Sequence, residues 1–152
     1  MVRVEFMRAT PEDAKFIGEN LRKADALEVS ALGADPAASV LVSLRASDMA
    51  WTAWVNGVPA MMFGAGGSIF DEAGFVWALG TDECTKHPRE MLIFGRKKLG
   101  ETLEIYPVLE NYCDARYSKA LRWLKRIGFD ISAPEKRGKN GELFCKITAR
   151  RA

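Results

Sequence analysis

VLENYCDARYSKALRWLKRIGF, from Val108 to Phe129, is the stretch of sequence that decides the fold. Its apolar beginning, extended back by two residues, predicts a strand over Tyr106–Tyr112. In Tyr117–Ile127 the apolar residues recur every three or four positions, which is typical of an amphipathic helix. Gly128 follows directly and ends that helix, because glycine readily adopts the backbone conformation that closes a helix. The stretch therefore predicts a strand, a loop and a helix in succession.

The residues just before this stretch predict a second strand–helix unit. Gly74–Leu79 reads GFVWAL and predicts a well-buried strand. A connection follows, and Pro88 is suited to the first turn of a helix that reaches about Glu104. The two units together give the order βαβα, which favours parallel pairing of the two strands.

The N-terminal half predicts a strand, helices and a hairpin. Thr10-Pro11 followed by two acids marks a helix start. Asn56-Gly57 between two runs of period-two apolar residues marks a two-residue hairpin turn. The predicted elements are a strand at Val2–Phe6, helices over Pro11–Lys23, Ala24–Leu32 and from Asp35, and strands at Ala50–Val55 and Val58–Phe63. At the C-terminus, Asp130–Ser132 is expected to pair with Leu143–Ile147 around a polar loop.

A hairpin followed by βαβα predicts an α/β (α+β) fold, with a mixed, mostly antiparallel sheet and helices on both faces. The chain has 152 residues, of which 48% are hydrophobic and 28% charged. This size and composition predict a single domain over residues 1–152. The net charge of +2 makes nucleic-acid binding unlikely, although the basic residues from Arg122 onward keep that alternative open.

The cysteines and the hydropathy of the sequence indicate where the protein is located and whether it binds a metal. Cys84, Cys113 and Cys145 show no CxxC spacing, so we expect neither a disulfide framework nor a metal site. No run of about 18 apolar residues exists, so we expect no membrane-spanning helix. The N-terminus lacks the apolar segment of a signal peptide. We therefore expect a cytoplasmic protein without a membrane partner.

The helix ended by Gly128-Phe129, together with the predicted element order, resembles the GNAT (Gcn5-related N-acetyltransferase) family. The resemblance implies a protein that uses acetyl-CoA to acylate an amine or a protein substrate. It implies that the cofactor lies between the Gly74–Leu79 and Tyr106–Tyr112 strands. By this resemblance, the backbone of Ala78, Leu79 and Gly80 would hold the pantetheine arm. Lys86, His87 and Arg89 would meet the phosphates at the start of the next helix.

The sequence departs from the family pattern at two places. The phosphate-binding loop of the family is rich in glycine, whereas Thr81–Arg89 contains none. The family tyrosine that protonates the leaving thiolate is replaced by Leu124. Tyr112 and Tyr117 are therefore the candidate acids, with Cys113 nearby. Glu83 is the candidate base, because the family often places a carboxylate after this strand; otherwise it is an acidic residue at a helix start.

Two further side chains near that loop have alternative interpretations. His87 is the only histidine, so it is either a general base or an exposed residue at a helix start. Cys84 lies three residues earlier, and a helix N-terminus would lower the pKa of its thiol. A Cys–His nucleophilic pair is one interpretation, and direct acyl transfer without a nucleophile is the other.

Within Asn111–Gly128, the sequence NYCDARYSKALRWLKRIG is similar to the GNAT-like internal virion protein A of short-tailed, T7-like bacteriophages. This narrower resemblance implies a phage protein that acts in the infected bacterial cytoplasm or in the virion. Two functions follow. The first is an N-acetyltransferase, and the alternative is a non-catalytic GNAT-fold protein that serves virion assembly or binds a host protein.

Overall fold

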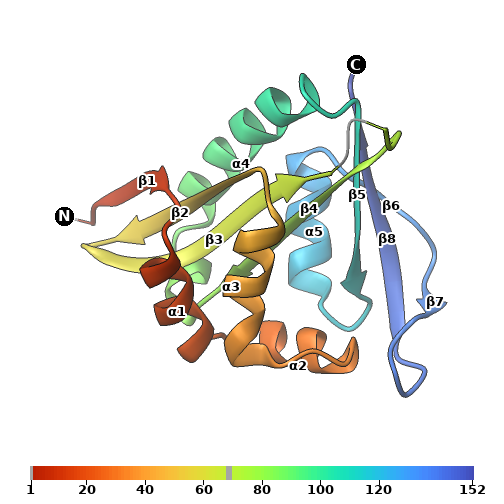
Figure 1. Cartoon of the computed structure of the whole chain (residues 1–152), viewed down its shortest axis with the longest axis horizontal. Coiled ribbons are helices and arrows are strands. Elements are labelled where there is room, and N and C mark those ends of the chain that lie inside the picture. Colours follow the sequence, from red (N-terminus) through yellow and green to blue (C-terminus); the bar gives the residue numbers. More distant parts are fainter. Residues whose placement is uncertain (1, 68–69) are drawn as a thin grey trace.

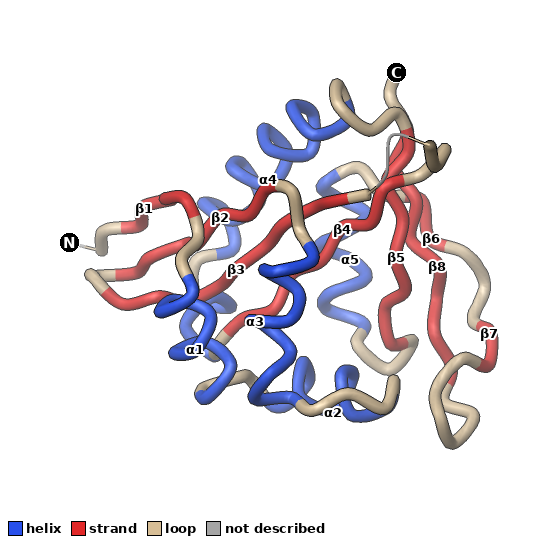
Figure 2. Tube along the Cα trace, viewed as in Figure 1, coloured by secondary structure: helices blue, strands red, loops and turns tan. Residues whose placement is uncertain are grey.

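The computed structural model describes residues 2–67 and 70–152. One mixed sheet runs through it in the order β1-β2-β3-β4-β5-β8-β6, with β7 paired to β8 (Figures 1 and 2). The strands are β1 Val4–Arg8, β2 Met49–Val55, β3 Val58–Gly66, β4 Gly74–Gly80, β5 Val108–Asp114, β6 Asp130–Ile131, β7 Glu135–Lys136 and β8 Leu143–Arg150. The helices are α1 Pro11–Glu19, α2 Lys23–Ala31, α3 Pro36–Ala46, α4 Pro88–Leu103 and α5 Ser118–Ile127, with a 3₁₀ helix, η1, at Asp82–Lys86.

Helices cover both faces of the sheet, as predicted. α1 and α3 lie on one face, and α4 and α5 lie on the other (Figure 1). Ile17 of α1 and Val40 of α3 are fully buried against Met62 and Leu79 of the sheet. The α4–α5 face buries a separate cluster that includes Ile127. All sheet pairings except β4 with β5 are antiparallel, which confirms the predicted mixed, mostly antiparallel sheet.

Local sequence signals form the elements that they predict. Thr10 caps α1: its hydroxyl accepts the N–H of Asp13, and the Asp13 carboxylate accepts the N–H of Thr10. Asn56 and Gly57 both have positive φ, as the predicted hairpin turn requires. β3 continues three residues beyond the predicted Phe63. Glycine at position 64 is needed there, because a Cβ atom would lie 2.7 Å from a backbone oxygen of β2.

Several other predicted boundaries differ from the structure; the first strand, predicted at Val2–Phe6, is Val4–Arg8, and three of the differences have a hydrogen-bonding reason. α1 ends at Glu19 rather than Lys23, because the N–H of Asn20 donates to the carbonyl of Ile17, three residues back, instead of continuing the helix. β5 begins two residues later than predicted, because the N–H of Tyr106 still bonds to the end of α4, on Thr102. It also continues to Asp114, which pairs with Phe144 of β8.

The fold places an opening between β4 and β5. These parallel strands pair at only two positions, Gly74 with Leu109 and Phe75 with Glu110, and then diverge. Where they part, the side-chain amide of Asn111 donates to the carbonyl of Val76. Beyond that bond the two strands are joined by no ladder pair in the described residues. The fold therefore leaves backbone groups of β4 facing a gap.

Among the described residues, no single helix has the length and apolar composition to cross a membrane. By those two measures alone, the pair α2 and α3, bent by 76° at the break between them, passes the same test together.

Candidate functional site

Helix α2 lies across the wide end of the gap (Figure 1). Two of its carboxylates, one helical turn apart, each hold the end of one strand. Asp25 Oδ2 accepts the N–H of Gly80, the last residue of β4, at 2.8 Å. Glu28 Oε2 accepts the N–H of Asp114, the last residue of β5, at 2.9 Å. Residues at positions i and i+3 lie on the same helix face, so one helix fixes both strand ends.

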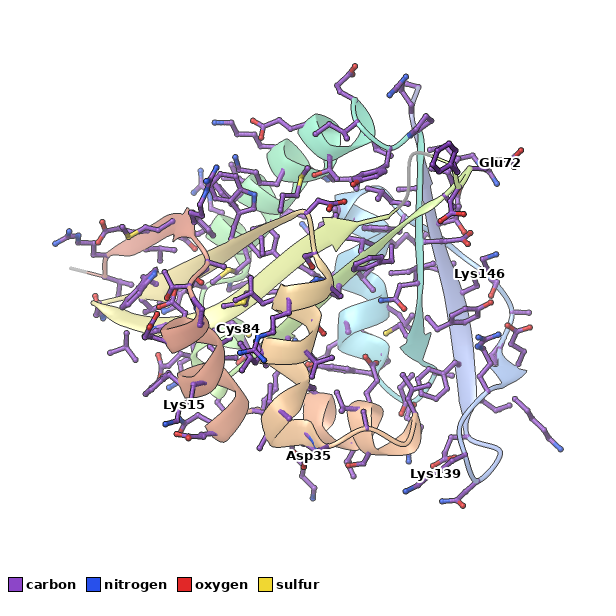
Figure 3. All side chains as sticks on the ribbon, in the orientation of Figure 1. Lys15, Asp35, Glu72, Cys84, Lys139 and Lys146 are labelled. Carbon is purple, nitrogen blue, oxygen red and sulfur yellow. The ribbon has the colours of Figure 1, made fainter. Side chains whose placement is uncertain are left out.

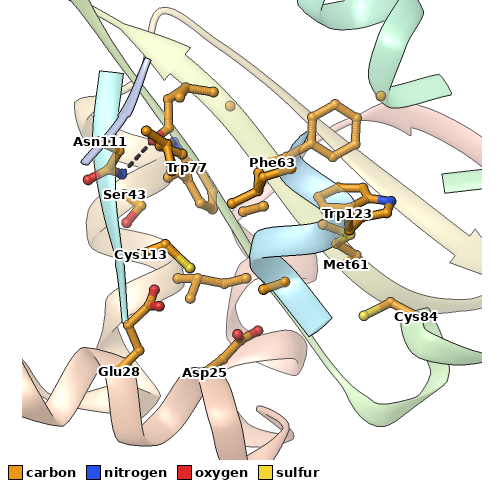
Figure 4. A pocket seen from close by; sticks show the side chains of 18 of the residues that line it. Asp25, Glu28, Ser43, Met61, Phe63, Trp77, Cys84, Asn111, Cys113 and Trp123 are labelled. Carbon is orange, nitrogen blue, oxygen red and sulfur yellow. Dashed lines mark hydrogen bonds between the residues drawn. The ribbon is translucent and has the colours of Figure 1, made fainter. Parts of the chain in front are cut away.

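A cavity of about 690 Å³ occupies the space between the splayed strands and the helices around them. Its volume lies within the usual range for small-molecule sites. Figure 4 shows Asp25 and Glu28 pointing into it from α2, opposite Trp77 and Trp123. One end reaches Thr85 of η1 and Pro88, the first residue of α4. The cavity thus connects the start of α4 with the carboxylates of α2.

The floor of the cavity carries a buried ion pair and a thiol. Arg22 Nε contacts Asp25 Oδ2 at 2.8 Å, and Arg22 Nη1 donates to the sulfur of Cys84 at 3.2 Å. Burial raises the pKa of Cys84 to about 11, with Arg22 opposing the shift. The lowered pKa expected from a helix N-terminus is therefore wrong, and Cys84 is a neutral thiol near pH 7. Figure 3 shows Cys84 inside the fold, whereas Lys15 and Lys139 lie at its margin.

Glu28 is the carboxylate that titrates near neutral pH. Burial raises its pKa to about 7, and the hydrogen bond from the Asp114 N–H only partly opposes this. No ion pair to Glu28 exists among the residues that the structure describes, and its other close neighbour is the thiol of Cys113. Burial, followed by the proximity of Glu28, raises the pKa of that thiol, so Cys113 stays protonated. Glu28 can therefore gain or lose a proton under ordinary conditions.

The two predicted tyrosines both line the cavity. Tyr117 is the N-cap residue of α5, and its ring lies 5.2 Å from the Arg22 guanidinium carbon. Burial raises the pKa of Tyr117, so its hydroxyl remains a proton donor at neutral pH. The ring of Tyr112 lies under Arg137, with 3.6 Å between the guanidinium carbon and the ring centroid. The structure thus brings Tyr117 and Glu28 to one cavity.

Glu83 lies apart from that pair. It belongs to η1, its side chain is 48% exposed, and it contacts Lys86 Nζ at 2.8 Å. Its hydrogen bond with Lys86 lowers the pKa of Glu83, which weakens it as a base. Glu83, Lys86, His87 and Arg89 are not among the residues that line the cavity. They are positioned beside its α4 end, next to Thr85 and Pro88.

The backbone groups predicted to hold a cofactor arm differ in what they already bind. Leu79 pairs with Met62 in the β3–β4 ladder. The N–H of Gly80 is held by Asp25, and its carbonyl accepts the N–H of Arg22 at 3.0 Å. Alternate strand residues present their backbone groups to the same edge, so Ala78 faces the gap as Gly80 does. Ala78 therefore faces the gap, whereas the gap-facing groups of Gly80 are already bonded to α2 and its N-cap.

The segment predicted to meet the phosphates offers few free backbone donors. In place of a glycine loop, Asp82–Lys86 forms a 3₁₀ helix, and Pro88 at the first position of α4 has no N–H to offer. The N–H groups of Arg89 and Glu90 belong to the first helical turn, where backbone donors have no partner within the helix. Within residues 2–67 and 70–152, no group of three or more His, Cys, Asp or Glu side chains is placed to hold a metal ion.

Glu28 is not among the residues that the sequence predicted for the site. The predicted helix Ala24–Leu32 nevertheless carries one signal. Asp25 and Glu28 are two carboxylates one turn apart among Ala, Leu and Val residues. Such a pair is expected on a solvated face, and only the position of α2 beneath the splayed strands brings it inside.

Neither a protein-family model nor a curated protein matches the chain. Solved structures match it over nearly its whole length. An N-acetyltransferase from Staphylococcus aureus is 10% identical, with 97% of this chain and 98% of that chain covered and a TM-score of 0.73. A GNAT-family acetyltransferase from Streptococcus pneumoniae is 14% identical, with 99% and 100% covered and a TM-score of 0.65. A Bacillus subtilis acetyltransferase in complex with CoA is 12% identical, with 100% of both chains covered and a TM-score of 0.65.

None of these three structures is named as a virion protein, so they give no support to the phage resemblance. Identities this low show the shared fold alone. The arrangement of this chain, with eight strands in a mostly antiparallel sheet, helices on both faces and splayed β4 and β5, is the GNAT fold.

Proposed function

We propose that this protein is an acyl-CoA-dependent N-acyltransferase. The observation that carries the proposal is the cavity between the splayed β4 and β5, which joins the α4 start to an acid–base pair. The likeness to solved structures supports it, because the three matched proteins are named as acetyltransferases and one was solved in complex with CoA. When bound, acetyl-CoA would supply an activated acyl thioester.

The cofactor arm would lie along β4. The N–H and carbonyl of Ala78 would hydrogen-bond to the arm, because they face the gap. Lys86, His87 and Arg89 would meet the phosphates as flexible side chains rather than as a rigid backbone cradle. We therefore expect weaker phosphate recognition than a glycine loop gives.

Glu28 and Tyr117 would perform the proton transfers. The ionised Glu28 carboxylate would accept a proton from the acceptor ammonium, freeing the nitrogen lone pair. The Tyr117 hydroxyl would donate a proton to the thiolate that leaves. Tyr112 is the second candidate acid, and Glu83 is the second candidate base.

Calorimetric titration of the whole chain with acetyl-CoA tests the proposal. We expect one molecule to bind per chain with a sub-millimolar Kd, and free thiol to accumulate when an acceptor amine is added. The absence of heat at near-millimolar acetyl-CoA, and with longer acyl-CoA donors, would contradict the proposal.

A comparison of two Glu→Gln variants assigns the base. Glu28→Gln keeps an oxygen for the Asp114 N–H but cannot accept a proton, so we expect a loss of about 10²–10⁴-fold in kcat. Glu83→Gln changes an exposed residue and should retain most activity. If Glu83→Gln lost activity and Glu28→Gln retained it, Glu83 would be the base.

A second candidate is a non-catalytic GNAT-fold binding protein. The occupation of both gap-facing groups of Gly80 by Asp25 and Arg22 favours it, as does the glycine-free 3₁₀ segment. A phage or host-protein partner belongs to this candidate and rests on the Asn111–Gly128 resemblance. Lack of acetyl-CoA binding by a correctly folded chain would favour it over the enzyme.

A further inference from the structure

The side of the cavity formed by α2 and α3 differs from the side formed by α4 and α5. It is lined mainly by apolar residues of both helices, together with Trp77, whose indole N–H donates to Ser47 at 2.7 Å. Two serines of α3, Ser39 and Ser43, also line it. The apolar residues from α2, α3 and their junction are Val29, Leu32, Ala34, Ala38 and Val42. This wall is suited to a hydrocarbon group rather than to a polar one.

The mouth of the cavity on this side is apolar and open to solvent. Leu32 and Val42 line the cavity, yet they are 48% and 64% exposed. Exposed large apolar side chains at a cavity rim favour a ligand with an apolar surface. The structure therefore gives an apolar ligand a route that does not cross the start of α4.

The charges on this side are negative. Glu28 lies inside, and Asp35, the N-cap of α3, lines the mouth. The cations that line the cavity either contact other groups already or lie on a different helix. Arg22 is paired with Asp25, Lys98 lies 3.8 Å from the centroid of the Trp51 ring, and Lys119 belongs to α5. A ligand ammonium would thus find an unpaired carboxylate, whereas a ligand carboxylate would find no free cation on the described α2–α3 wall.

We propose that the α2–α3 side is the acceptor site and that it selects a primary monoamine with an aliphatic or aromatic body and no carboxylate. The ammonium would donate to Glu28, and the body would lie against the apolar wall and Trp77. This inference rests on the proposed function, because it places the acceptor nitrogen at the base. A free amino acid would be rejected, since its carboxylate would lie unpaired beside Glu28 and Asp35.

Binding of phenethylamine and of phenylalanine tests this selection, because the two differ by one carboxylate. Each is titrated calorimetrically into the whole chain, with and without saturating CoA. We expect phenethylamine to bind at least roughly ten-fold more tightly, as expected for one unpaired charge. Equal affinities, or no phenethylamine binding in either condition, would overturn the proposal.

Two variants locate the binding site, and one variant serves as a control. Glu28→Gln should weaken phenethylamine binding roughly ten-fold or more, as expected when a hydrogen bond between two charged groups is lost. Val42→Arg places a cation at the mouth, on an exposed residue, and should also weaken it. Val58→Arg makes the same change at an exposed position outside the cavity lining and should leave the affinity unchanged. If neither Glu28→Gln nor Val42→Arg alters the affinity, the proposal fails.

The acetyl-CoA titration keeps this result separate from the proposed function. Phenethylamine binding without acetyl-CoA binding would refute the transferase and leave an amine-binding site. Acetyl-CoA binding and transfer to phenylalanine as readily as to phenethylamine would support the transferase and refute the acceptor class.

Discussion

Glu28→Gln should change the pH dependence of stability, whether or not the protein is an enzyme. Glu28 is partly buried, lacks a cationic partner among the described residues, and has its pKa raised to about 7 from 4.5. Between these two values the folded state binds more protons than the unfolded state, so stability falls as pH rises. The contribution of the protonated form is fully present below about 4.5 and is lost through about 7.

The magnitude follows from the size of the shift. The rise of the pKa from 4.5 to about 7 corresponds to roughly 3 kcal/mol when both states are fully ionised. Most of that loss falls between pH 5 and pH 8, where linkage gives about 2–3 kcal/mol for this residue. Glutamine keeps the acceptor for the Asp114 N–H and has no proton to lose. The variant should therefore gain about 2–3 kcal/mol relative to wild type over this range.

Urea unfolding of both proteins at pH 5, 6, 7 and 8 measures the effect. At each pH, the unfolding free energy of wild type is subtracted from that of Glu28→Gln. Groups that titrate in the same way in both proteins then contribute nothing to the difference. Glu110→Gln is the matched control, because this carboxylate is only partly buried, with a side chain 39% exposed, pairs with Lys146 and lies outside the cavity lining. If the stabilities of wild type and Glu28→Gln changed equally with pH, Glu28 would not be a buried carboxylate that titrates near neutral pH. Its assignment as the base would then fail too.

Three further substitutions test the site. Tyr117→Phe should lower kcat by about 10²-fold with little change in acetyl-CoA affinity, measured by thiol release and calorimetry; an unchanged kcat would remove Tyr117 as the acid. Arg22→Ala should destabilise the fold by about 3–5 kcal/mol, because it leaves Asp25 buried without its partner, and adding Asp25→Asn should recover part of this in urea unfolding; no recovery would contradict the ion-pair explanation. Gly80→Ala should cost about 1–3 kcal/mol, since its Cβ would lie 2.7 Å from Cys84 Sγ, and Cys84→Ala should relieve that contact.

Much of the fold was predictable because its signals are local. The cap at Thr10, the turn at Asn56-Gly57 and the glycine at 128 each act through the backbone of a few neighbouring residues. Gly128 has a φ of 136°, which residues with a Cβ rarely adopt, so the end of α5 is fixed by the sequence. The boundaries of β5 were less predictable, because they depend on hydrogen bonds to α4 and on the β8 partner.

The candidate site was only half predictable. Tyr117 was found because the β5–α5 loop follows the strand directly, so its position depends on nearby sequence. Glu28 was not found, because it lies 86 positions from Asp114, whose N–H it accepts. Glu83 was chosen for its place after β4, but its side chain turns to Lys86 three residues away.

The sequence by itself determined the order of strands and helices, the caps and turns that bound them, and the presence of Tyr117 at the start of α5. Tertiary structure alone decided which carboxylate faces the gap. The pKa of a carboxyl group depends on burial and on what surrounds it, and for Glu28 these come from the end of β5, far along the chain. An acidic helix face that reads as solvated thus becomes the floor of a cavity, because β4 and β5 separate above it.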